Sequence, residues 1–225
     1  MDVWRELARA ETGEGDTIVL RRRGEIFDIR FNGWELMSSS NSVSETTLAR
    51  VVCGQCHKEA PKILIGGLGM GYTLRTVLDA VGREAKITVC ELRKEIVEWN
   101  SGVLAPLAAH PLKDMRVKLR NVNVVEVIRD GGQVFDVVLL DTDNGPDFIL
   151  HRPNRDLYNS KGLAFVSRIL GQDGVAGFWS STESAEFEDS LDSIDWKWRR
   201  LRVELDVPGK QVFHVVYMAG RSLPQ

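Results

Sequence analysis

Hydrophobic and polar positions divide the chain into a short first part and a longer second part. The first part holds three short apolar runs, at residues 18–20, 26–31 and 34–37. Gly24 and the Asn32-Gly33 pair separate these runs, and such residues are typical of tight turns between antiparallel strands. We therefore predict a small β-hairpin unit here, preceded over residues 1–15 by a weak helix or a tail.

In the second part, apolar runs alternate with helical patterns. The apolar runs lie at residues 62–67, 86–92, 117–119, 134–141 and 174–180. The helical patterns are clearest at residues 44–53, 72–81, 93–99, 123–129 and 156–170. Strands this apolar are expected where helices cover both faces of a parallel sheet. We expect Ser44 to be the N-cap of the first of these helices.

Two more apolar runs, at residues 198–205 and 212–219, flank Pro208-Gly209 near the C-terminus. They predict an antiparallel hairpin that finishes the sheet. We therefore expect an α/β, Rossmann-like fold with a doubly wound sheet and a C-terminal hairpin. Residues 1–43 would form the small N-terminal β unit and residues 44–225 the main domain.

Composition narrows the classes of partner. The chain has 29 Lys and Arg against 32 Asp and Glu, a formal net charge of -3, which argues against a nucleic-acid partner. Its apolar runs are too short for a membrane span, and its first residues lack a signal peptide's apolar core. Three cysteines fit a reducing compartment, and four scattered histidines lack metal-ligand spacing. We expect a cytoplasmic protein without a metal.

A glycine-rich turn is the strongest local signal. The first apolar run of the second part leads into four glycines, and a helical pattern follows at once; the glycines are Gly66, Gly67, Gly69 and Gly71. Such a turn lets the backbone approach a ligand that any Cβ would block. About twenty residues on, Glu91 ends the next strand, where a carboxylate can hold ribose hydroxyls. The alternative is a tight structural turn followed by a surface Glu.

The glycine spacing bears on the kind of nucleotide. A dinucleotide site normally has Gly-x-Gly-x-x-Gly, whereas this chain has Gly67-x-Gly69-x-Gly71. The observed spacing is closer to the looser turn of S-adenosylmethionine enzymes. Spacing alone leaves both cofactors open.

The fourth apolar run of the second part ends in a group of polar residues. Asp141 ends the run, and Asp143 and Asn144 follow it. Ligands of open α/β sheets bind beyond the carboxyl ends of the strands, so we predict Asp141 as a general base or nucleophile-positioning group and Asp143 as a second acceptor. We also consider Asn144, Tyr158 and Trp179 as substrate-binding residues. The alternatives are that Asp143 and Asn144 cap the next segment and that the two aromatic residues belong to the core.

With these motifs the chain resembles the spermidine synthase family, within the class I S-adenosylmethionine-dependent methyltransferase-like fold. The resemblance covers the hairpins near Arg23, the glycine turn, Glu91, residues 135–146, the Leu157-Tyr158 pair and the strand up to Ser180. It implies a seven-stranded sheet with a reversed last strand, an adenosyl sulfonium cofactor and a homodimer. It also implies that Asp141 is the catalytic aspartate.

Some residues depart from that family. Gly69 stands where aminopropyltransferases carry the Asp that holds the amino group of decarboxylated S-adenosylmethionine. Its lack of a carboxylate leaves space for the carboxylate of intact S-adenosylmethionine. Asn123 stands where the family has an adenine-contacting Asp, and Gly162 where part of a polyamine-holding aromatic pair is expected.

Three functions follow from this combination. The leading one is a transferase that uses S-adenosylmethionine to methylate a small polar acceptor. The second is a polyamine aminopropyltransferase that uses decarboxylated S-adenosylmethionine. The third is a nucleotide-binding module without catalysis. In each case we expect the nucleotide to contact the four glycines of the turn, Glu91 and Asn123.

A competing motif lies before the glycine turn. Residues 53–57, Cys-Gly-Gln-Cys-His, match the attachment motif of c-type haem. Haem attachment requires export, and a covalent haem would be awkward at a helix end that leads into a core strand. We therefore interpret the match as a chance occurrence.

Overall fold

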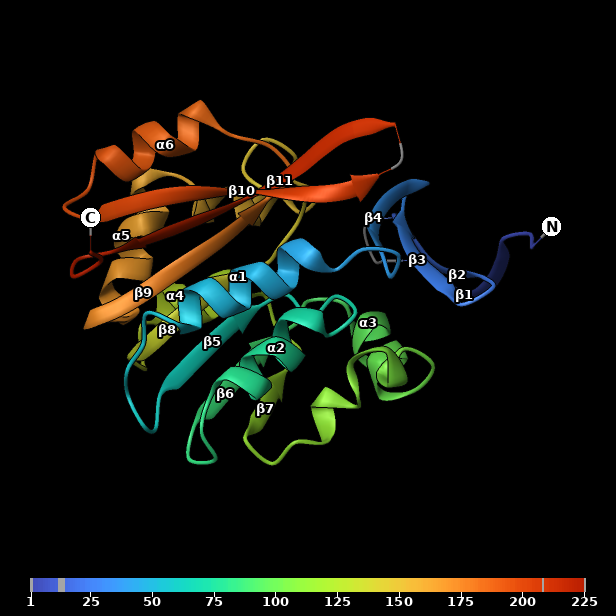
Figure 1. Ribbon diagram of the computed structural model, residues 1–225, viewed down its shortest axis with the longest axis horizontal. Helices are drawn as coiled ribbons and strands as arrows, with labels where there is room; N and C mark the ends of the chain where they lie inside the picture. The colour runs from blue at the N-terminus through green and yellow to red at the C-terminus, as the bar shows by residue number, and fades with distance from the viewer. Residues whose placement is uncertain (1, 12–14, 208, 225) are drawn as a thin grey trace. The chain divides into compact units, whose positions relative to one another are not determined.

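The computed structural model describes residues 2–11, 15–207 and 209–224 and contains two compact units, Met1–Ser42 and Val43–Gln225 (Figure 1). The first unit is a four-stranded antiparallel sheet in chain order, formed by β1 (Arg5–Glu11), β2 (Thr17–Arg23), β3 (Ile26–Phe31) and β4 (Trp34–Ser38). The predicted turns are present, because Gly24, Asn32 and Gly33 all have positive φ.

The strand β1 corrects the prediction of a helix or tail over residues 1–15. β1 pairs with β2 along its length. Its less exposed face carries Ala8 and Ala10, which are small and favour helices, so the alternation was not visible as a strand pattern. The correction concerns residues 5–11, and residues 12–14 lie outside the described part of the chain.

The second unit contains a seven-stranded mixed sheet in the order β10-β11-β9-β8-β5-β6-β7. Its strands are β5 (Lys62–Gly66), β6 (Lys86–Cys90), β7 (Val117–Arg120), β8 (Phe135–Leu140), β9 (Leu170–Ser180), β10 (Lys197–Val207) and β11 (Lys210–Gly220). The first five run parallel, whereas β11 pairs antiparallel with both β9 and β10. The predicted fold class, including the closing hairpin, is confirmed.

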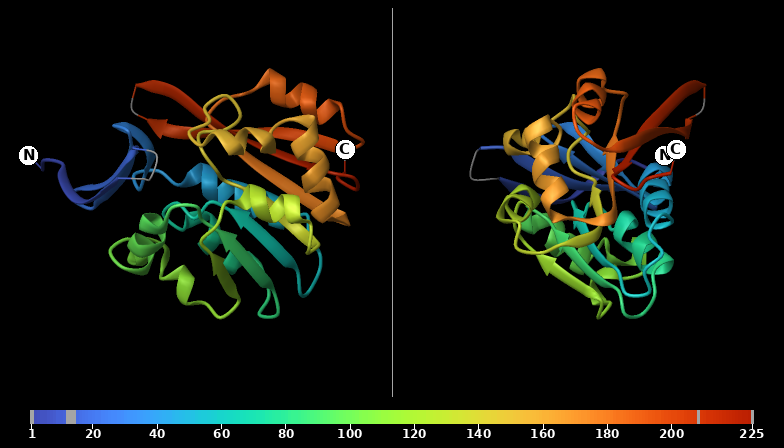
Figure 2. Two further views of the ribbon diagram at one scale, coloured as in Figure 1. Left: turned by 180° about the vertical axis from the view of Figure 1, so that it is seen from behind. Right: turned by 90° about the vertical axis from the view of Figure 1, so that its left-hand side faces the viewer.

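Helices cover both faces of this sheet (Figures 1 and 2). The helices are α1 (Val43–Cys53), α2 (Tyr72–Ala80), α3 (Lys94–Ser101), α4 (Val124–Asp130), α5 (Ser160–Ile169) and α6 (Ala185–Asp192), with short 3-10 segments at Ala105–Ala108, Pro111–Lys113 and Arg152–Leu157. α1 and α2 pack together on one face, and α4, α5 and α6 share a core on the other. This is the two-sided arrangement that near-continuous apolar strands require.

Two helix predictions need correction. The single helix predicted over residues 156–170 is a 3-10 segment followed by α5, because Asn159 accepts a hydrogen bond from Gly162 N at 2.9 Å and caps a new helix there. Gly162 has no room for a side chain, since a Cβ would lie 1.3 Å from Asp156 O. Ser44 is not an N-cap, because α1 begins one residue earlier, at Val43.

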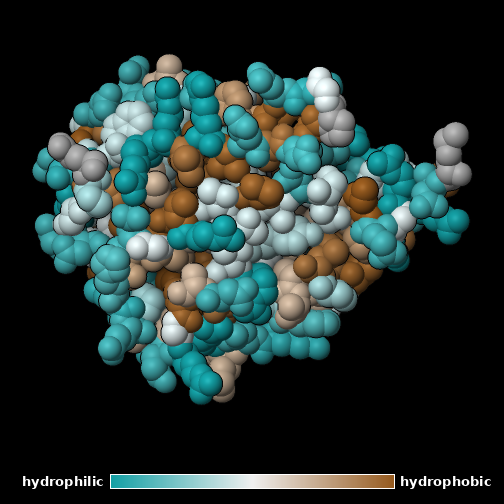
Figure 3. All heavy atoms as spheres, in the orientation of Figure 1, coloured by the Kyte–Doolittle hydropathy of each residue, from teal (hydrophilic) through white to brown (hydrophobic). Residues whose placement is uncertain are grey.

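The surface of the molecule carries both hydrophilic and apolar side chains (Figure 3). On the face shown in Figure 3, hydrophilic side chains occupy most of the rim and apolar ones lie among them nearer the middle. Among the described residues, no helix combines the length and the hydropathy needed to span a bilayer.

Candidate functional site at the carboxyl ends of the strands

The glycine turn brings the end of β5 against the end of β8. Gly67 has a φ of 92°, its N donates to Cys90 O at 2.8 Å, and a Cβ on it would lie only 2.0 Å from Asp141 O. Gly66 is similarly confined, because a Cβ on it would collide with the side chains of Val124 and Leu140. These two glycines are therefore required for the backbone to pass beside Asp141.

The rest of the turn leads into the N-terminus of α2. Gly69 and Gly71 have φ values of 53° and 85°, and Gly71 is the N-cap of α2. Asn100 Nδ2 from α3 donates to Gly69 O at 2.7 Å and holds the turn in place. The turn thus presents backbone and the start of a helix, which favours polar or negative ligand groups.

Glu91 follows β6 and contacts the same turn. Its Oε2 accepts from Leu68 N at 2.9 Å, and its Oε1 accepts from Arg93 N at 2.8 Å. Burial raises the pKa of Glu91, which is 6% exposed, while these backbone N–H groups lower it. A carboxylate has about four acceptor positions, so Glu91 keeps acceptor capacity for a ligand hydroxyl. Its burial differs from the surface position that the structural alternative assumed.

Asn123 is a buried N-cap beside β6 and β7. Its Oδ1 accepts from Val125 N at 2.8 Å and begins α4. Nearby, Asn121 Nδ2 donates to Glu91 O at 2.7 Å and joins the two loops that follow β6 and β7. The structure gives Asn123 a capping role, and its contact with adenine stays a prediction.

Asp141 comes directly after β8 and faces α2. Its Oδ2 accepts from Thr73 Oγ1 at 2.6 Å. Burial first and the charge of Glu45 second raise the pKa of Asp141 to about 7, against the lowering effect of Thr73. A carboxyl group with a pKa near 7 can take and return protons at neutral pH, as a general base must.

The comparisons with known proteins agree with this geometry. The family model described as the spermine/spermidine synthase domain matches residues 43–194, which include the glycine turn, Glu91 and Asp141. The chain belongs to this family. The predicted resemblance is therefore confirmed.

A curated relative and two solved structures extend the comparison. A polyamine aminopropyltransferase of Prochlorococcus marinus is 32% identical over 141 residues, which are 61% of this chain and 45% of that protein. A spermidine synthase in complex with the transition state analogue AdoDATO has a TM-score of 0.75 at 18% identity, covering 98% of this chain and 73% of that one. A spermidine synthase from Thermotoga maritima gives 0.75 at 17%, covering 98% and 74%. The structural matches establish the fold.

In this spermine/spermidine synthase family member, Asp143 and Asn144 hold the loop after β8 together. Asp143, at a φ of 53°, accepts from Asn154 Nδ2 at 2.8 Å and from His151 N at 3.3 Å. Burial raises the pKa of Asp143, and these donors oppose the rise. Asn144 O accepts from Ser181 Oγ at 2.7 Å. The bonds of the Asp143 carboxylate favour the capping alternative for that residue, whereas the bond of Asn144 involves its backbone and leaves the role of its side chain a prediction.

The two aromatic candidates lie in different places. Tyr158 belongs to the core beside α5 and α6: its ring packs edge-on against Phe187 with centroids 5.5 Å apart, and its hydroxyl reaches Thr142 O at 3.2 Å. Phe178 on β9 pairs in register with Leu140 on the neighbouring strand β8. Trp179 follows Phe178 and Asp141 follows Leu140, so the two residues are at neighbouring positions. Trp179 thus follows in register beside Asp141, and Tyr158 places its hydroxyl on Thr142, the residue after Asp141.

Three residues without a local sequence signal form a further polar group, and one of them, Glu45, acts on Asp141 through its charge. Ser44 Oγ donates to Glu45 Oε2 at 2.6 Å and lies 2.9 Å from His214 Nδ1. The ring of His214 packs edge-on against Trp179, with centroids 4.7 Å apart. Burial raises the pKa of Glu45 and lowers that of His214. His214 is 170 residues from Ser44 in the chain, so only the folded sheet brings them together.

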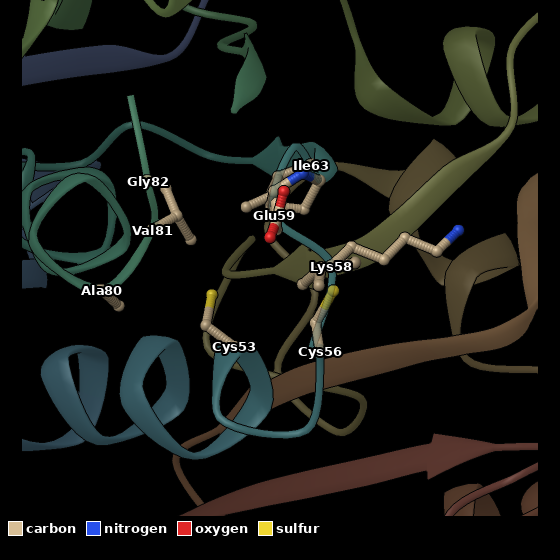
Figure 4. A pocket seen from close by; sticks show the side chains of 10 residues that line it. Cys53, Cys56, Lys58, Glu59, Ile63, Ala80, Val81 and Gly82 are labelled. Atoms are coloured by element: carbon tan, nitrogen blue, oxygen red, sulfur yellow. The ribbon is translucent and has the colours of Figure 1, made fainter. Parts of the chain in front are cut away.

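The cysteine motif lies at the other end of the strands. Cys53 and Cys56 line a pocket of about 310 Å³ near the start of β5 and the end of α2, with Lys58 and Glu59 on its wall (Figure 4). Both thiols are free, and burial raises the pKa of Cys53 to about 12. Among the described residues, no cluster of three or more His, Cys, Asp and Glu side chains is arranged to hold a metal ion.

Proposed function

We propose that this protein transfers an aminopropyl group from decarboxylated S-adenosylmethionine to the nitrogen of a small amine. Family membership and the aminopropyltransferase relative support this reading over methyl transfer, the leading expectation from sequence, which the comparisons do not support. The observation that carries the proposal is Asp141: a carboxyl group of raised pKa, beside the glycine turn and close to a second carboxylate, Glu45.

The donor nucleotide fits the edge formed by the glycine turn and Glu91. The backbone at Gly67 leaves no room for a Cβ, and Gly67, Gly69 and Gly71 have positive φ angles, which glycine adopts without strain. In this proposal Glu91 accepts hydrogen bonds from the ribose hydroxyls, and Asn123 contacts the adenine. When bound, the donor supplies a carbon on a cationic sulfur, which an amine displaces in line.

In this proposal Asp141 removes a proton from the ammonium group of the acceptor. A primary amine has a pKa of about 10.4 and arrives as an ammonium ion, which must lose a proton before its nitrogen can attack. Moving the pKa of the base from 3.8 to about 7 lowers the cost of that proton transfer by roughly 4 kcal/mol. The negative charges of Asp141 and Glu45 also favour a cationic acceptor and a cationic sulfur. Positioning supplies much of the remaining acceleration.

Gly69 keeps one alternative open for experiment. Its lack of a carboxylate favours intact S-adenosylmethionine, and therefore methyl transfer, as the second candidate function. Calorimetric titration of the purified protein with each form of the cofactor distinguishes the two. The proposal predicts at least tenfold tighter binding of the decarboxylated form. Tighter binding of the intact form, or binding of neither, would contradict it.

Titration of two variants tests whether cofactor binding depends on Glu91. Glu91→Gln keeps the shape of the side chain but weakens its acceptor strength, so we expect about tenfold weaker binding of the decarboxylated cofactor. The control is Asp136→Asn, at the opposite end of β8, where the carboxylate pairs with Lys58. This control should bind the cofactor as the wild type does.

A further inference from the structure

Glu45, Ser44 and His214 form a hydrogen-bonded chain on the same face of the sheet as Asp141. Trp179, on β9, is at the position next to Asp141, which follows β8. Trp179 pairs with Val216 on β11, and Val216 is two residues along that strand from His214. Side chains two residues apart on a strand share a face, so His214 lies on this face as well. α1 packs on the same strands, and its first turn supplies Ser44 and Glu45.

The hydrogen bonds of Ser44 give this chain a direction. Ser44 is 1% exposed and has a single hydroxyl proton. With Glu45 ionised, Ser44 donates to Glu45 Oε2, so His214 Nδ1–H must donate to Ser44 Oγ. With Glu45 protonated, Glu45 donates to Ser44 and Ser44 donates to an unprotonated Nδ1. The same three side chains thus support two hydrogen-bond arrangements that differ by one proton.

We propose that Glu45, Ser44 and His214 form a proton relay, which carries the proton released by the acceptor amine from Asp141 toward solvent. This inference rests on the proposed function, because aminopropyl transfer to an ammonium ion releases one proton in every turnover. Asp141 is partly buried and bonded to Thr73 of α2, and each turnover must restore its carboxylate. Glu45 is the neighbouring carboxylate whose charge acts on Asp141.

Each step of the relay balances. The ammonium nitrogen gives a proton to Asp141, and its lone pair forms the new C–N bond as the C–S bond breaks and its electron pair goes to the sulfur. Asp141 then passes the proton to Glu45. The neutral His214 ring exchanges its Nδ1 proton for one on Nε2 through water, which leaves Nδ1 able to accept. Glu45 then gives its proton to Ser44 Oγ while the Ser44 hydroxyl proton moves to His214 Nδ1. The imidazolium releases its Nε2 proton to water, which leaves the ring in its starting Nδ1–H tautomer and Glu45 ionised.

The surroundings of His214 suit the last step. The ring is half-buried, and desolvation lowers its pKa, so the imidazolium releases its proton readily at neutral pH. On β10 its partner in register is Val203, and on β9 Trp179 packs against its ring. From α1, Ser44 is bonded to its Nδ1, and Ser44 is bonded in turn to Glu45. Arg202, next to Val203, is paired with Glu183.

Kinetics of three variants test the relay. In Glu45→Gln, Ser44→Ala and His214→Ala, we expect kcat to fall by 10- to 100-fold while cofactor affinity stays within twofold. Added imidazole should restore part of the rate of His214→Ala and none of that of Ser44→Ala. His57→Ala is the control, because His57 is exposed and lies at the opposite end of the strands. Wild-type rates in His214→Ala, or no effect of imidazole on it, would overturn the relay.

A measurement on the wild type tests the relay even if one of the variants fails to fold. Nitrogen NMR of the wild-type ring at pH above its pKa should show His214 mainly as the Nδ1–H tautomer, and Ser44→Ala should lose that preference. A wild-type ring that is mainly Nε2–H would overturn the relay. Absence of aminopropylated product from the wild type would instead refute the proposed function. Normal turnover by His214→Ala would refute the relay alone.

Discussion

At the scale of single residues, Asp141 combines burial, a neighbouring carboxylate and one hydrogen-bond donor. We expect Asp141→Asn to lower kcat by about 10²- to 10⁴-fold, the range that a general base supplies, while the affinity for the decarboxylated cofactor changes only a few-fold. Steady-state kinetics with calorimetry check this. The matched control is Asp136→Asn at the start of β8, which should keep wild-type kcat. Equal losses in both variants would contradict the role of Asp141.

Gly67 is the residue on which the position of Asp141 depends. In Gly67→Ala, the new Cβ would meet Asp141 O at 2.0 Å, and alanine at a φ of 92° costs about 1–3 kcal/mol in itself. We therefore expect a lower free energy of unfolding, measured in urea, and loss of cofactor binding. Gly132→Ala, where a Cβ meets nothing within 4 Å, should change the free energy of unfolding by less than about 0.5 kcal/mol. Similar values for the two variants would refute this account.

At the scale of elements, α2 acts on β8 through one side chain in its first turn. Thr73 Oγ1 donates to Asp141 and lowers its pKa, so Thr73→Val should raise that pKa further. Activity requires the ionised base, so the rise of kcat with pH should move to higher pH, by roughly one unit for a bond to a charged group. In the control Thr76→Val, the lost hydroxyl donates to Tyr72 O within the helix, and the profile of kcat against pH should stay in place.

The arrangement of the helices and strands determines which features could be predicted from the sequence. Apolar runs revealed the parallel strands because both faces of the sheet are covered, and parallel strands end at one edge, so Gly67, Glu91 and Asp141 were expected to lie together. β1 was missed because its less exposed positions are alanines. Glu45 and His214 were missed because they come from α1 and β11, and no local pattern links positions so far apart.

At the scale of the whole molecule, the buried carboxyl groups make stability depend on pH. The pKa of Asp141 is about 7 in the folded protein, against about 3.9 when unfolded, so folding favours its protonated form. Its contribution to stability is fully present below pH 4 and is lost as pH rises through 7. The melting temperature of the wild type, minus that of Asp141→Asn, should therefore decrease between pH 4 and pH 8. A difference that stays constant over this range would contradict the raised pKa.

Aminopropyl transfer to an amine is the activity proposed for this site. The most direct test is a competition in which the protein meets equal amounts of decarboxylated and intact S-adenosylmethionine with a mixture of short diamines. Mass spectrometry then identifies the group that each amine has gained. We expect aminopropylated amines, formed by the wild type and by Asp136→Asn but not by Asp141→Asn. Methylated amines, or no modified amine at all, would contradict it.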